Sequence, residues 1–465
     1  MFESVPTLLE NLVLGRSIER RLNFAKLLPH WLLARIQASE FQQTVCRAGE
    51  HSSYYRRRFA AQGIETRRVR LPADLGDFYT TAADLRALPV DDFLCARPQA
   101  GFETTGTTAR NKRVYFSNEE VHDIGFEGAV GLWNLGLRPE DRVVDAFDYA
   151  FWNAGITLLH SLNAIGCFHV IASKLPPEEF YERVREYRFN VLIVDTAWLV
   201  TLTEIAERRG VWPVKFILSG SENLAEATRA WIERVWAAKV YQAYGQTESL
   251  GATGIECPAQ RGYHLNEFNF LFELRQPNAE GWGELVFTTL TRKVMPLIRY
   301  RSNDITRLLD DDCGCPLACM RRIDKIAGRA DEIISCGMGM ISPWIFETWL
   351  SGCPGLADDW QVAVTQPGVR DRLLLRLERS AGAPPAGEIE AELTRRLEQR
   401  FPYYYKNWRM GMYEIGFEFL ERGSLRPAGV RRKLRRLLDE RIPTPARQPL
   451  SAAVETLGSE FQSQD

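Results

Sequence analysis

Short apolar runs and longer amphipathic stretches alternate through the centre of the chain, and this alternation limits the possible folds more than any other feature. The apolar runs have the length of β-strands, and the stretches between them carry apolar residues at helical spacing. Strands separated by helices usually form a parallel sheet with helices on its faces. The pattern therefore predicts an α/β fold with mainly parallel sheets. The predicted strands are RVVDAF (142–147), NVLIVD (190–195), VKFILSG (214–220) and KVYQAYG (239–245), and the predicted helices include 178–189 and 224–238.

The pattern changes along the chain in a way that predicts two domains and a tail. A chain of 465 residues, 45 % of them hydrophobic, can bury more than one core. The segment GRADEIIS (328–335) combines glycine with charged residues, as an exposed, flexible connection does. We expect a large domain at 1–330, a small mobile α+β domain at 331–441 and a flexible tail at 442–465. Residues 40–90 are predicted to be mainly helical.

The balance of charge argues against a nucleic-acid or membrane partner. Lysine and arginine total 58, and aspartate and glutamate total 60, so no global field attracts the chain to an anionic polymer or surface. Residues 1–21 do not resemble a signal peptide, and no apolar run reaches the roughly 18 residues of a transmembrane helix. Nine scattered cysteines indicate reduced thiols rather than a disulfide framework. The predicted compartment is the cytoplasm.

Two predicted strands end in polar turns that contain glycine, SGSEN (219–223) and YGQTE (244–248). In open α/β sheets, ligands collect beyond the carboxyl ends of the strands. The carboxylate of Glu248 is suited to holding Mg²⁺ against the phosphates of a nucleotide. A single glutamate at the end of a strand is nevertheless more often an exposed loop residue.

Four threonines surround a glycine in TTGTTARNK (104–112), which ends in Lys112. Hydroxyls and backbone amides can surround a phosphate while a lysine neutralises it, although the spacing is not that of the common P-loop. A polar surface turn is the alternative. Asp304, in PLIRYRSNDITR (296–307), and Arg329 are by themselves more typical of ordinary salt bridges.

Taken together and in this order, these segments resemble the AMP-forming adenylating superfamily, which includes acyl-CoA and aryl-CoA ligases. The resemblance is closer to the phenylacetate-CoA ligase branch and spans roughly residues 40–441. It rests on TTGTTARNK, SGSEN, YGQTE and YRSND, on GELVFTTLTRKVMPLIRYRSNDI (283–305), on GRADEIIS and on the early SSYYRRRFAAQGI (52–64).

The resemblance implies a role for each matching residue. It implies a phosphate loop made of Thr104, Thr105, Gly106, Thr107, Thr108 and Lys112. It places Gly220, Ser221, Glu222, Tyr244 and Gly245 around adenine, Thr247 near the AMP phosphate, Glu248 at Mg²⁺, and Asp304 with Arg329 at the ribose hydroxyls. Two positions depart from the family pattern: Ala109 and Asn303 both stand where glycine is usual, so the geometry around the nucleotide could differ there.

The cysteines of CGCPLAC (313–319) are spaced in a way that suits a metal better than disulfides. Some members of the resembled branch bind zinc through a Cys and a His after the magnesium motif and a Cys-x-Cys after the ribose motif. The resemblance therefore implies a closed, structural zinc site made of Cys257, His264, Cys313 and Cys315. Cys319 could substitute for one ligand, and buried free cysteines are the alternative.

Aromatic residues crowd VDAFDYAFWNAG (144–155), in the region where relatives line the pocket for the acid. Aromatic walls suit a flat, apolar acid, although core packing would explain at least half of these residues. The candidate substrate-contacting residues are Phe147, Tyr149, Phe151, Trp152 and Ala243.

The basic segment SLRPAGVRRKLRR (424–436) has three interpretations: a nucleic-acid tail, an exposed helix face, or an active-site segment. The balanced charge of the chain weakens the first. Relatives carry a catalytic lysine near the carboxyl end, and counting back from LLDER (437–441) places Lys433 there if the turn holds two extra residues. An ordinary surface lysine is the alternative. Leu434, Leu437 and Leu438 have helical spacing, which predicts an amphipathic helix after Lys433.

The resemblance implies a two-step reaction. A carboxylate attacks the α-phosphorus of ATP and expels pyrophosphate, and a thiol, most simply that of CoA, then attacks the acyl-adenylate and releases AMP. The implied cofactors are ATP, Mg²⁺, CoA as acceptor, and structural Zn²⁺, and the small domain is expected to rotate between the steps about a hinge at Asp331. A carrier-protein thiol or an amine as acceptor, and a degenerate nucleotide-binding protein, remain alternatives. A homodimer is a further possibility.

Overall fold

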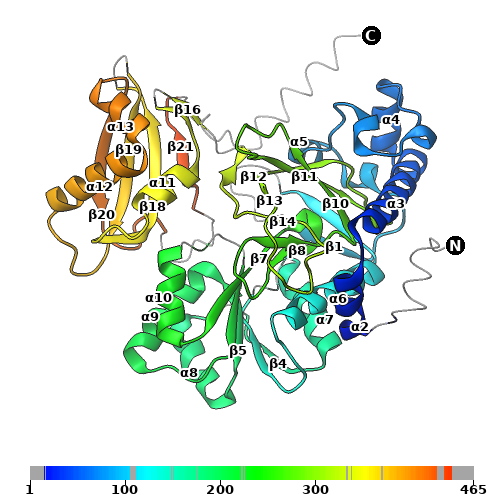
Figure 1. Ribbon diagram of the computed structural model, residues 1–465, viewed down its shortest axis with the longest axis horizontal. Helices are drawn as coiled ribbons and strands as arrows, with labels where there is room; N and C mark the ends of the chain where they lie inside the picture. The colour runs from blue at the N-terminus through cyan, green and yellow to red at the C-terminus, as the bar shows by residue number, and fades with distance from the viewer. Residues whose placement is uncertain are drawn as a thin grey trace, which may run out of the picture. The chain divides into compact units, whose positions relative to one another are not determined.

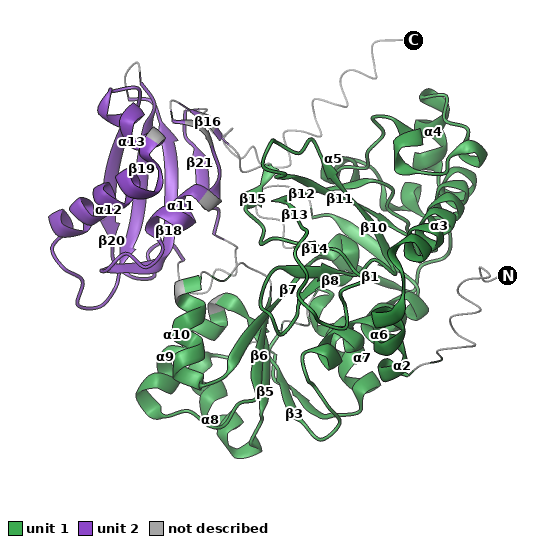
Figure 2. Cartoon of the chain, in the orientation of Figure 1, with its two compact units in different colours: residues 1–330 green, residues 331–465 purple. Residues whose placement is uncertain are grey.

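The computed structural model describes residues 15, 17–104, 111–147, 149, 151–173, 175–220, 224, 226–330, 334–336, 338–367, 370–426 and 434–441. The chain forms two compact units, residues 1–330 and 331–465 (Figure 2). The division follows Ala330, so Asp331, the expected hinge, is the first residue of the second unit. Asp331 and the expected tail (442–465) lie outside the described residues.

Helices occupy most of the described chain up to residue 93, as predicted for residues 40–90. In the long helix α3, buried residues recur at helical spacing from Leu33 through Phe41 and Val45 to Ala48, so one stripe faces the core. Ser52 caps the next helix by accepting a hydrogen bond from the amide of Tyr55. The elements are α2 (Ile18–Leu27), α3 (His30–His51), α4 (Ser53–Ala61), α5 (Ala82–Ala87) and the 3₁₀ helices η1 (Thr66–Arg68), η2 (Pro72–Leu75) and η3 (Val90–Phe93).

A nine-stranded sheet with the order β13-β14-β9-β8-β7-β6-β5-β3-β4 forms the centre of the first unit (Figure 1). The four predicted strands are its members β3, β5, β6 and β7. Pairing is parallel from β4 to β7 and antiparallel from β7 to β13. The strands are β3 (Arg142–Asp145), β4 (Phe168–Ile171), β5 (Val191–Asp195), β6 (Phe216–Gly220), β7 (Lys239–Gln246), β8 (Gly251–Glu256), β9 (Tyr263–Leu265), β13 (Leu308–Leu309) and β14 (Arg322–Ile323).

Helices cover both faces of the parallel half, which explains why apolar residues point to both faces of its inner strands. In β5, Leu192 and Val194 pack with α8, α9 and α10, whereas Val191 and Ile193 pack with α6 and α7. The predicted α/β class is therefore confirmed, with mixed rather than mainly parallel sheets. The helices are α6 (Asn118–Asn134), α7 (Ala154–Ile165), α8 (Pro177–Tyr187), α9 (Thr196–Arg209) and α10 (Glu226–Trp236).

Two smaller antiparallel sheets complete the first unit. A hairpin of β1 (Ala100–Glu103) and β2 (Arg113–Phe116) flanks residues 104–112. A four-stranded sheet has the order β10-β11-β12-β15. Its strands are β10 (Phe270–Arg275), β11 (Gly283–Thr289), β12 (Tyr300–Thr306) and β15 (Gly328–Arg329). Gly328 and Arg329, the first two residues of GRADEIIS, are thus part of a sheet, with Arg329 in register with Asp304.

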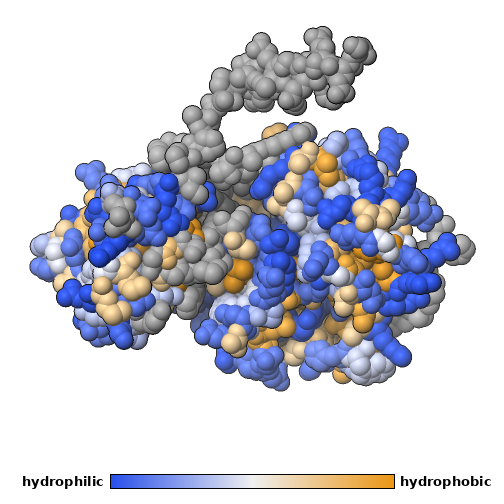
Figure 3. All heavy atoms as spheres, turned by 90° about the horizontal axis from the view of Figure 1, so that it is seen from above, coloured by the Kyte–Doolittle hydropathy of each residue, from blue (hydrophilic) through white to orange (hydrophobic). Residues whose placement is uncertain are grey.

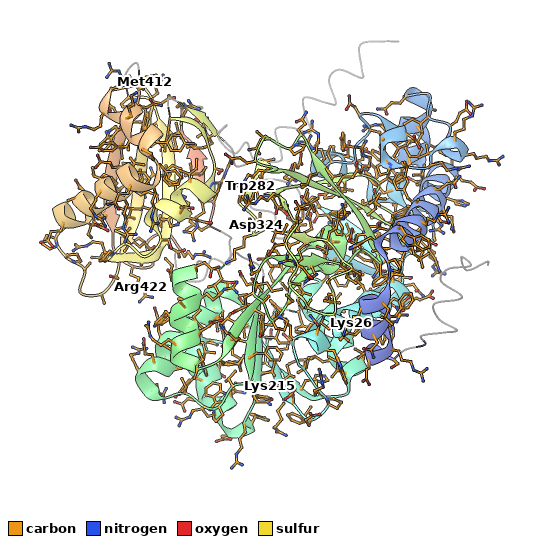
Figure 4. The ribbon with its side chains drawn as sticks, viewed as in Figure 1. Lys26, Lys215, Trp282, Asp324, Met412 and Arg422 are labelled. Atoms are coloured by element: carbon orange, nitrogen blue, oxygen red, sulfur yellow. The ribbon has the colours of Figure 1, made fainter. Side chains whose placement is uncertain are left out.

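Side-chain contacts fix the ends of these strands. Arg307, which follows β12, donates to Oδ2 of Asp324 at 2.9 Å and lies 4.8 Å from the ring centroid of Trp282. Figure 4 labels Trp282 and Asp324. In the nine-stranded sheet, Lys215 directly precedes β6 and Asp141 directly precedes β3. Nζ of Lys215, which Figure 4 also labels, lies 2.8 Å from Oδ2 of Asp141.

The second unit is a four-stranded sheet, β20-β19-β18-β21, whose core includes residues of α11 and α12. Figure 1 shows the helices of this unit lying together against the sheet. A short hairpin, β16 with β17, precedes them. The elements are β16 (Ile334–Cys336), β17 (Gly339–Ile341), α11 (Pro343–Leu350), β18 (Leu356–Thr365), β19 (Arg372–Arg379), α12 (Ala386–Arg400), α13 (Pro402–Arg409), β20 (Glu414–Leu420) and β21 (Leu437–Asp439).

The helix expected after Lys433 is wrong, because Leu437 and Leu438 belong to strand β21 instead. β21 pairs in parallel with β18, where Val362 lies opposite Leu437. The amide of Val362 donates to the carbonyl of Arg436 at 2.8 Å, and Leu437 is fully buried. Two adjacent leucines fit a helix or a strand, and here the backbone groups of β18 decide in favour of the strand.

Hydrophilic residues are interspersed with smaller apolar patches on the face shown in Figure 3. Among the described residues, no helix combines the length and the apolar character that crossing a bilayer requires.

Candidate active site

A tight turn at the carboxyl end of β7 positions the first group of candidate residues. The 3₁₀ helix η4 (Thr247–Ser249) follows β7 directly. Leu250 and Gly251 then adopt φ angles of 65° and 102°, and the chain returns as β8. A Cβ at position 251 would lie 2.8 Å from Oγ1 of Thr157, so only glycine fits. The turn fixes Thr247 and Glu248 where the parallel half of the sheet ends.

Glu248 is buried, with two partners on its carboxylate and a third on its backbone carbonyl. Its side chain is 2 % exposed and forms an ion pair with Nζ of Lys112. The hydroxyl of Tyr300 donates to its Oε1 at 2.6 Å, and Arg292 donates to its backbone carbonyl at 2.7 Å. Burial opposes ionisation, but Lys112 and Tyr300 outweigh it, so the pKa of Glu248 lies below its ordinary value. Glu248 is therefore an anion at neutral pH.

Asp304, in β12, is the second buried carboxylate. Its Oδ2 accepts a 2.6 Å hydrogen bond from the hydroxyl of Tyr244 and lies 3.3 Å from Nε2 of Gln246. Its Oδ1 lies 3.2 Å from Nη1 of Arg329, the residue opposite it in β15. Burial and the charge of Asp304 raise the pKa of Tyr244 far above its ordinary value, so this hydroxyl stays protonated as a donor. The structure thus brings Tyr244, Asp304 and Arg329 together.

Asn303 explains how the chain tolerates the loss of the usual glycine before Asp304. Its φ angle is 64°, in the left-handed region that glycine adopts readily and asparagine adopts more easily than most other residues. The amide of Asn303 faces Oε1 of Glu284 at 3.3 Å. The substitution therefore leaves the left-handed backbone in place.

The described part of the expected phosphate loop consists of its two ends. The amide of Thr104 donates to the carbonyl of Lys112 at 3.0 Å, and the amide of Lys112 donates back to Oγ1 of Thr104 at 3.2 Å. These bonds close the loop at the end of the β1–β2 hairpin, from which Lys112 reaches Glu248. The remaining expected loop residues, Thr105, Gly106, Thr107 and Thr108, and the departure at Ala109, lie outside the described residues.

The end of β6 meets the aromatic segment that follows β3. Gly220 is buried, and a Cβ there would lie 3.4 Å from Cζ of Phe147 and 3.7 Å from the carbonyl oxygen of Ala243. Phe147 and Ala243 both pack, partly buried, against the apolar core. An adenine-site candidate and two substrate-site candidates are therefore neighbours. Gly245 is exposed within β7, and Ser221 and Glu222 lie outside the described residues.

Asp145, which the sequence analysis did not single out, holds Tyr149. The hydroxyl of Tyr149 donates to Oδ2 of Asp145 at 2.5 Å, and the amide of Phe147 donates to Oδ1 at 2.8 Å. Burial raises the pKa of Asp145 to about 7, although both hydrogen bonds oppose this shift. The ring of Tyr149 requires glycine at position 155, where a Cβ would lie 2.6 Å from its Cε2.

The other two aromatic candidates lie nearer the surface. Phe151 is 68 % exposed, and its carbonyl accepts a hydrogen bond from the amide of Glu103 at 2.9 Å. Trp152 is half-buried. In the described state Phe151 therefore does not form part of an enclosed aromatic wall.

Four potential metal ligands lie together at the antiparallel end of the large sheet. Cys257 follows β8, His264 lies in β9, and Cys313 and Cys315 lie between β13 and β14. Their ligand atoms all lie within 4.8 Å of one another. Nε2 of His264 is 3.3 Å from both Sγ of Cys313 and Sγ of Cys315. A tetrahedral zinc site with bonds of about 2.0–2.3 Å needs donor separations of roughly 3.5 Å, so the donor set fits.

The surroundings of this cluster orient its ligands. Nδ1 of His264 lies 3.2 Å from the carbonyl of Met320, so donation there leaves Nε2 to face the sulfurs. Gly314 adopts a φ of 67° between the two cysteines, and the amide of Leu317 donates to Sγ of Cys315 at 3.3 Å.

The thiols of the cluster are electrostatically coupled. Hydrogen bonding to Cys315 and then to His264 lowers the pKa of Cys257, and the same contact with Cys257 raises the pKa of Cys315. Two thiolates at this spacing repel each other unless a cation lies between them. Cys319, the possible substitute, packs instead with Ala25, Leu317 and Met320, and burial raises its pKa to about 11.

Lys433, the expected catalytic lysine, lies outside the described residues. Tyr300, Arg292 and Asp145 are at the site, although sequence patterns did not predict them there. Tyr300 and Arg292 lie within the 283–305 segment, but no local pattern distinguishes them, because their partner Glu248 lies 52 and 44 positions away. Asp145 had one usable signal, a charged residue within the apolar run RVVDAF.

The chain is similar in sequence to known AMP-binding enzymes and ligases. A family model described as "AMP-binding enzyme" matches residues 104–267, the span from the phosphate loop past Glu248. The phenylacetate-coenzyme A ligase of Aromatoleum evansii is 28 % identical over 74 % of this chain and 81 % of its own. The phenylacetate-coenzyme A ligase of Thermus thermophilus is 28 % identical over 76 % and 83 %.

Solved structures establish the same fold. The crystal structure of a 2-hydroxyisobutyryl-CoA ligase in the postadenylation state covers 92 % of each chain at 19 % identity, with a TM-score of 0.73. The O-succinylbenzoate coenzyme A synthetase of Bacillus subtilis, in complex with ATP and magnesium, covers 69 % of this chain and 66 % of its own at 18 % identity, with a TM-score of 0.52.

Proposed function

Because the chain belongs to the adenylate-forming AMP-binding enzymes of the phenylacetate-CoA ligase-like branch, we propose that it converts a carboxylic acid, ATP and CoA into an acyl-CoA thioester, AMP and pyrophosphate. The observation that carries this proposal is the meeting of Lys112, Glu248, Tyr244 and Asp304 where the parallel half of the sheet ends. A buried carboxylate with a lysine beside it suits a magnesium–phosphate site. A second buried carboxylate with a neighbouring arginine suits the hydroxyls of a ribose.

In the first step, the carboxylate of the acid attacks the α-phosphorus of ATP, and pyrophosphate leaves. Both reactants are anions, so their approach needs positive charge. Mg²⁺, when bound, would supply part of that charge. Glu248 would hold the metal, and Lys112 and Thr104 with the rest of the phosphate loop would hold the departing phosphates. Asp304 and Arg329 would fix the ribose, and Thr247 would approach the α-phosphate.

In the second step, the thiol of CoA attacks the carbonyl of the acyl-adenylate, forming the thioester and releasing AMP. We infer CoA as the acceptor from the phenylacetate-coenzyme A ligases that the chain resembles. A carrier-protein thiol or an amine would receive the same acyl group, so a reaction with and without CoA distinguishes them. A cytoplasmic location and a homodimer remain predictions.

We infer an aromatic acid as the substrate. Phe147 meets Gly220 and Ala243 beside the proposed adenine site, and Tyr149 is held next to it by Asp145. These rings offer a flat apolar contact surface. Trp152, and Phe151 after a change of conformation, would extend that surface.

Lys433 is proposed as the lysine that bridges the substrate carboxylate and the α-phosphate during adenylation. It is the single lysine in the basic segment 424–436. Lys433→Ala should abolish acid-dependent pyrophosphate exchange while AMP still binds, and Lys406→Ala, on α13, is the control. Unchanged pyrophosphate exchange in Lys433→Ala would mean that Lys433 is an ordinary surface lysine.

The cluster of Cys257, His264, Cys313 and Cys315 is proposed as a structural zinc site. All four positions of a tetrahedral site are filled by protein ligands, which leaves none for a reacting water. The metal would join β8, β9 and the loop before β14. These elements lie at the antiparallel end of the nine-stranded sheet, whereas the proposed active site lies where β7 ends.

Pyrophosphate release in a panel of aromatic and aliphatic acids, each with and without CoA, tests the proposed function. Release that depends on one class of acid, with thioester formed only when CoA is present, is the expected result. Absence of release with every acid would reject it.

A further inference from the structure

The hydroxyl of Tyr300 shares one oxygen of Glu248 with Lys112. Tyr300 donates to Oε1 at 2.6 Å, and Nζ of Lys112 contacts the same atom. Tyr300 and Glu248 are each 1 % exposed, so water cannot easily replace either partner. The carboxylate therefore has one neutral and one charged partner at the same oxygen.

The two partners differ in how firmly the fold holds them. Tyr300 is the first residue of β12, lies opposite Phe287 in β11, and packs its ring 5.3 Å from that phenylalanine. Its main chain also bridges to Thr80. Lys112 instead extends four methylene groups from the end of a hairpin loop, and its side chain is 11 % exposed. A phosphate group would attract the charged ammonium of Lys112 more strongly than the neutral hydroxyl of Tyr300.

We propose that Tyr300 is a positioning residue that keeps the Glu248 carboxylate in place when Lys112 moves to the nucleotide phosphates. This inference rests on the proposed function, in which Lys112 binds phosphate and Glu248 binds the metal. Without Tyr300, movement of the Lys112 side chain to the phosphates would leave the buried Glu248 carboxylate free to rotate. With Tyr300 on Oε1, the second oxygen, Oε2, keeps a fixed direction for a cation.

A reciprocal contact supports this role. Tyr244 precedes Glu248 in YGQTE and donates to Asp304, whereas Tyr300 precedes Asp304 in YRSND and donates to Glu248. Each segment therefore carries one carboxylate and supplies the tyrosine that orients the carboxylate of the other. The positions of the proposed metal and ribose ligands are coupled through these two bonds.

Tyr300→Phe removes only the hydroxyl, and Tyr55→Phe is the matched control. Tyr55 is also buried, and its hydroxyl accepts from the amide of Ile298 and donates to the carbonyl of Pro296, two and four residues before Tyr300. Tyr55 also contacts Oγ1 of Thr80, so Tyr55→Phe loses more buried phenol hydrogen bonds beside the start of β12 than Tyr300→Phe does. A loss of metal binding confined to Tyr300→Phe therefore cannot come from a general structural cost. Of these two tyrosines, Tyr300 is the one that contacts Glu248.

The test is the binding of Mn²⁺, followed by electron paramagnetic resonance, to each protein saturated with an ATP analogue that has a methylene bridge between the α and β phosphates. AMP affinity in EDTA is measured alongside. We expect Tyr300→Phe to weaken Mn²⁺ binding about tenfold, the scale of a hydrogen bond to a charged group, with AMP affinity kept within about twofold. Tyr55→Phe should leave both values near wild type.

Mn²⁺ affinity in Tyr300→Phe within about twofold of wild type would overturn the inference, as would an equal loss in Tyr55→Phe. The readout needs no turnover. Failure of the proposed function, seen as absence of acid-dependent pyrophosphate release by the wild type, is therefore distinguishable from failure of this inference.

Discussion

The hydroxyl of Tyr244 donates a 2.6 Å hydrogen bond to Oδ2 of Asp304, which lies 60 positions further along the chain. The bond joins the carboxyl end of β7, in the nine-stranded sheet, to β12 of the four-stranded sheet. It leaves Oδ1 of Asp304 facing Arg329 at 3.2 Å. The proposed ribose site therefore depends on two sheets and is sensitive to either partner.

Asp304→Asn should weaken AMP binding at least tenfold, because the amide cannot accept as many hydrogen bonds from ribose hydroxyls and places a donor toward Tyr244 or Arg329. Tyr244→Phe should weaken it several-fold by releasing Asp304. Isothermal titration with AMP measures both. Tyr263→Phe is the control, since its ring packs 6.0 Å from Tyr244 in the adjacent part of the sheet. Unchanged AMP affinity in Asp304→Asn would contradict the proposal that Asp304 binds the ribose.

Lys112→Ala should destabilise the protein by about 3 kcal/mol at pH 7.5, because it leaves Glu248 buried without its cation. Glu248→Gln added to Lys112→Ala should recover much of that loss. The folded pKa of Glu248 is lowered, so the pair stabilises the fold above the unfolded glutamate pKa of about 4.3 and loses this effect as pH falls through the folded value. Denaturation midpoints at pH 7.5 and 4 measure the difference, which should shrink at pH 4. A difference independent of pH would argue that Lys112 acts through packing.

Asp145→Asn should change the pH dependence of stability with the opposite sign. The pKa of Asp145 in the folded state is raised to about 7. The stability that this carboxyl contributes is therefore fully present below its unfolded-state pKa of about 3.9, and it is lost as the pH rises toward 7. Relative to wild type, the variant should gain on the order of 2 kcal/mol between pH 5 and pH 8. Denaturation curves at both pH values test this, and parallel changes in the two proteins would contradict it.

Purified protein should contain about one zinc per chain, and Cys313→Ser should reduce that content and lower the thermal midpoint by several degrees. Cys319→Ser is the matched control, because Cys319 lies in the same loop but packs in an apolar cluster. Metal analysis by mass spectrometry, with chelator-free purification, provides the measurement. Wild-type protein with well under one zinc per chain, or equal zinc in Cys313→Ser, would reject the site.

Sequence patterns predicted the parallel half of the fold well, since β3, β5, β6 and β7 are buried on both faces and read as continuous apolar runs. They failed at Leu437 and Leu438, where leucine spacing fits a helix and the free edge of β18 decides for a strand. Motif order identified Glu248 and Asp304. It could not identify Tyr300 or Arg292 as partners of Glu248, because such contacts between distant residues exist only after the sheets pack.

The products of one reaction test the central claim most directly. The protein is incubated with ATP, Mg²⁺, CoA and the most effective acid from the panel, and nucleotides, pyrophosphate and thioester are quantified by chromatography. We predict AMP, pyrophosphate and acyl-CoA in equal amounts, with AMP formation dependent on the acid. ADP and phosphate as the nucleotide products, or ATP consumption that is independent of the acid, would contradict adenylation.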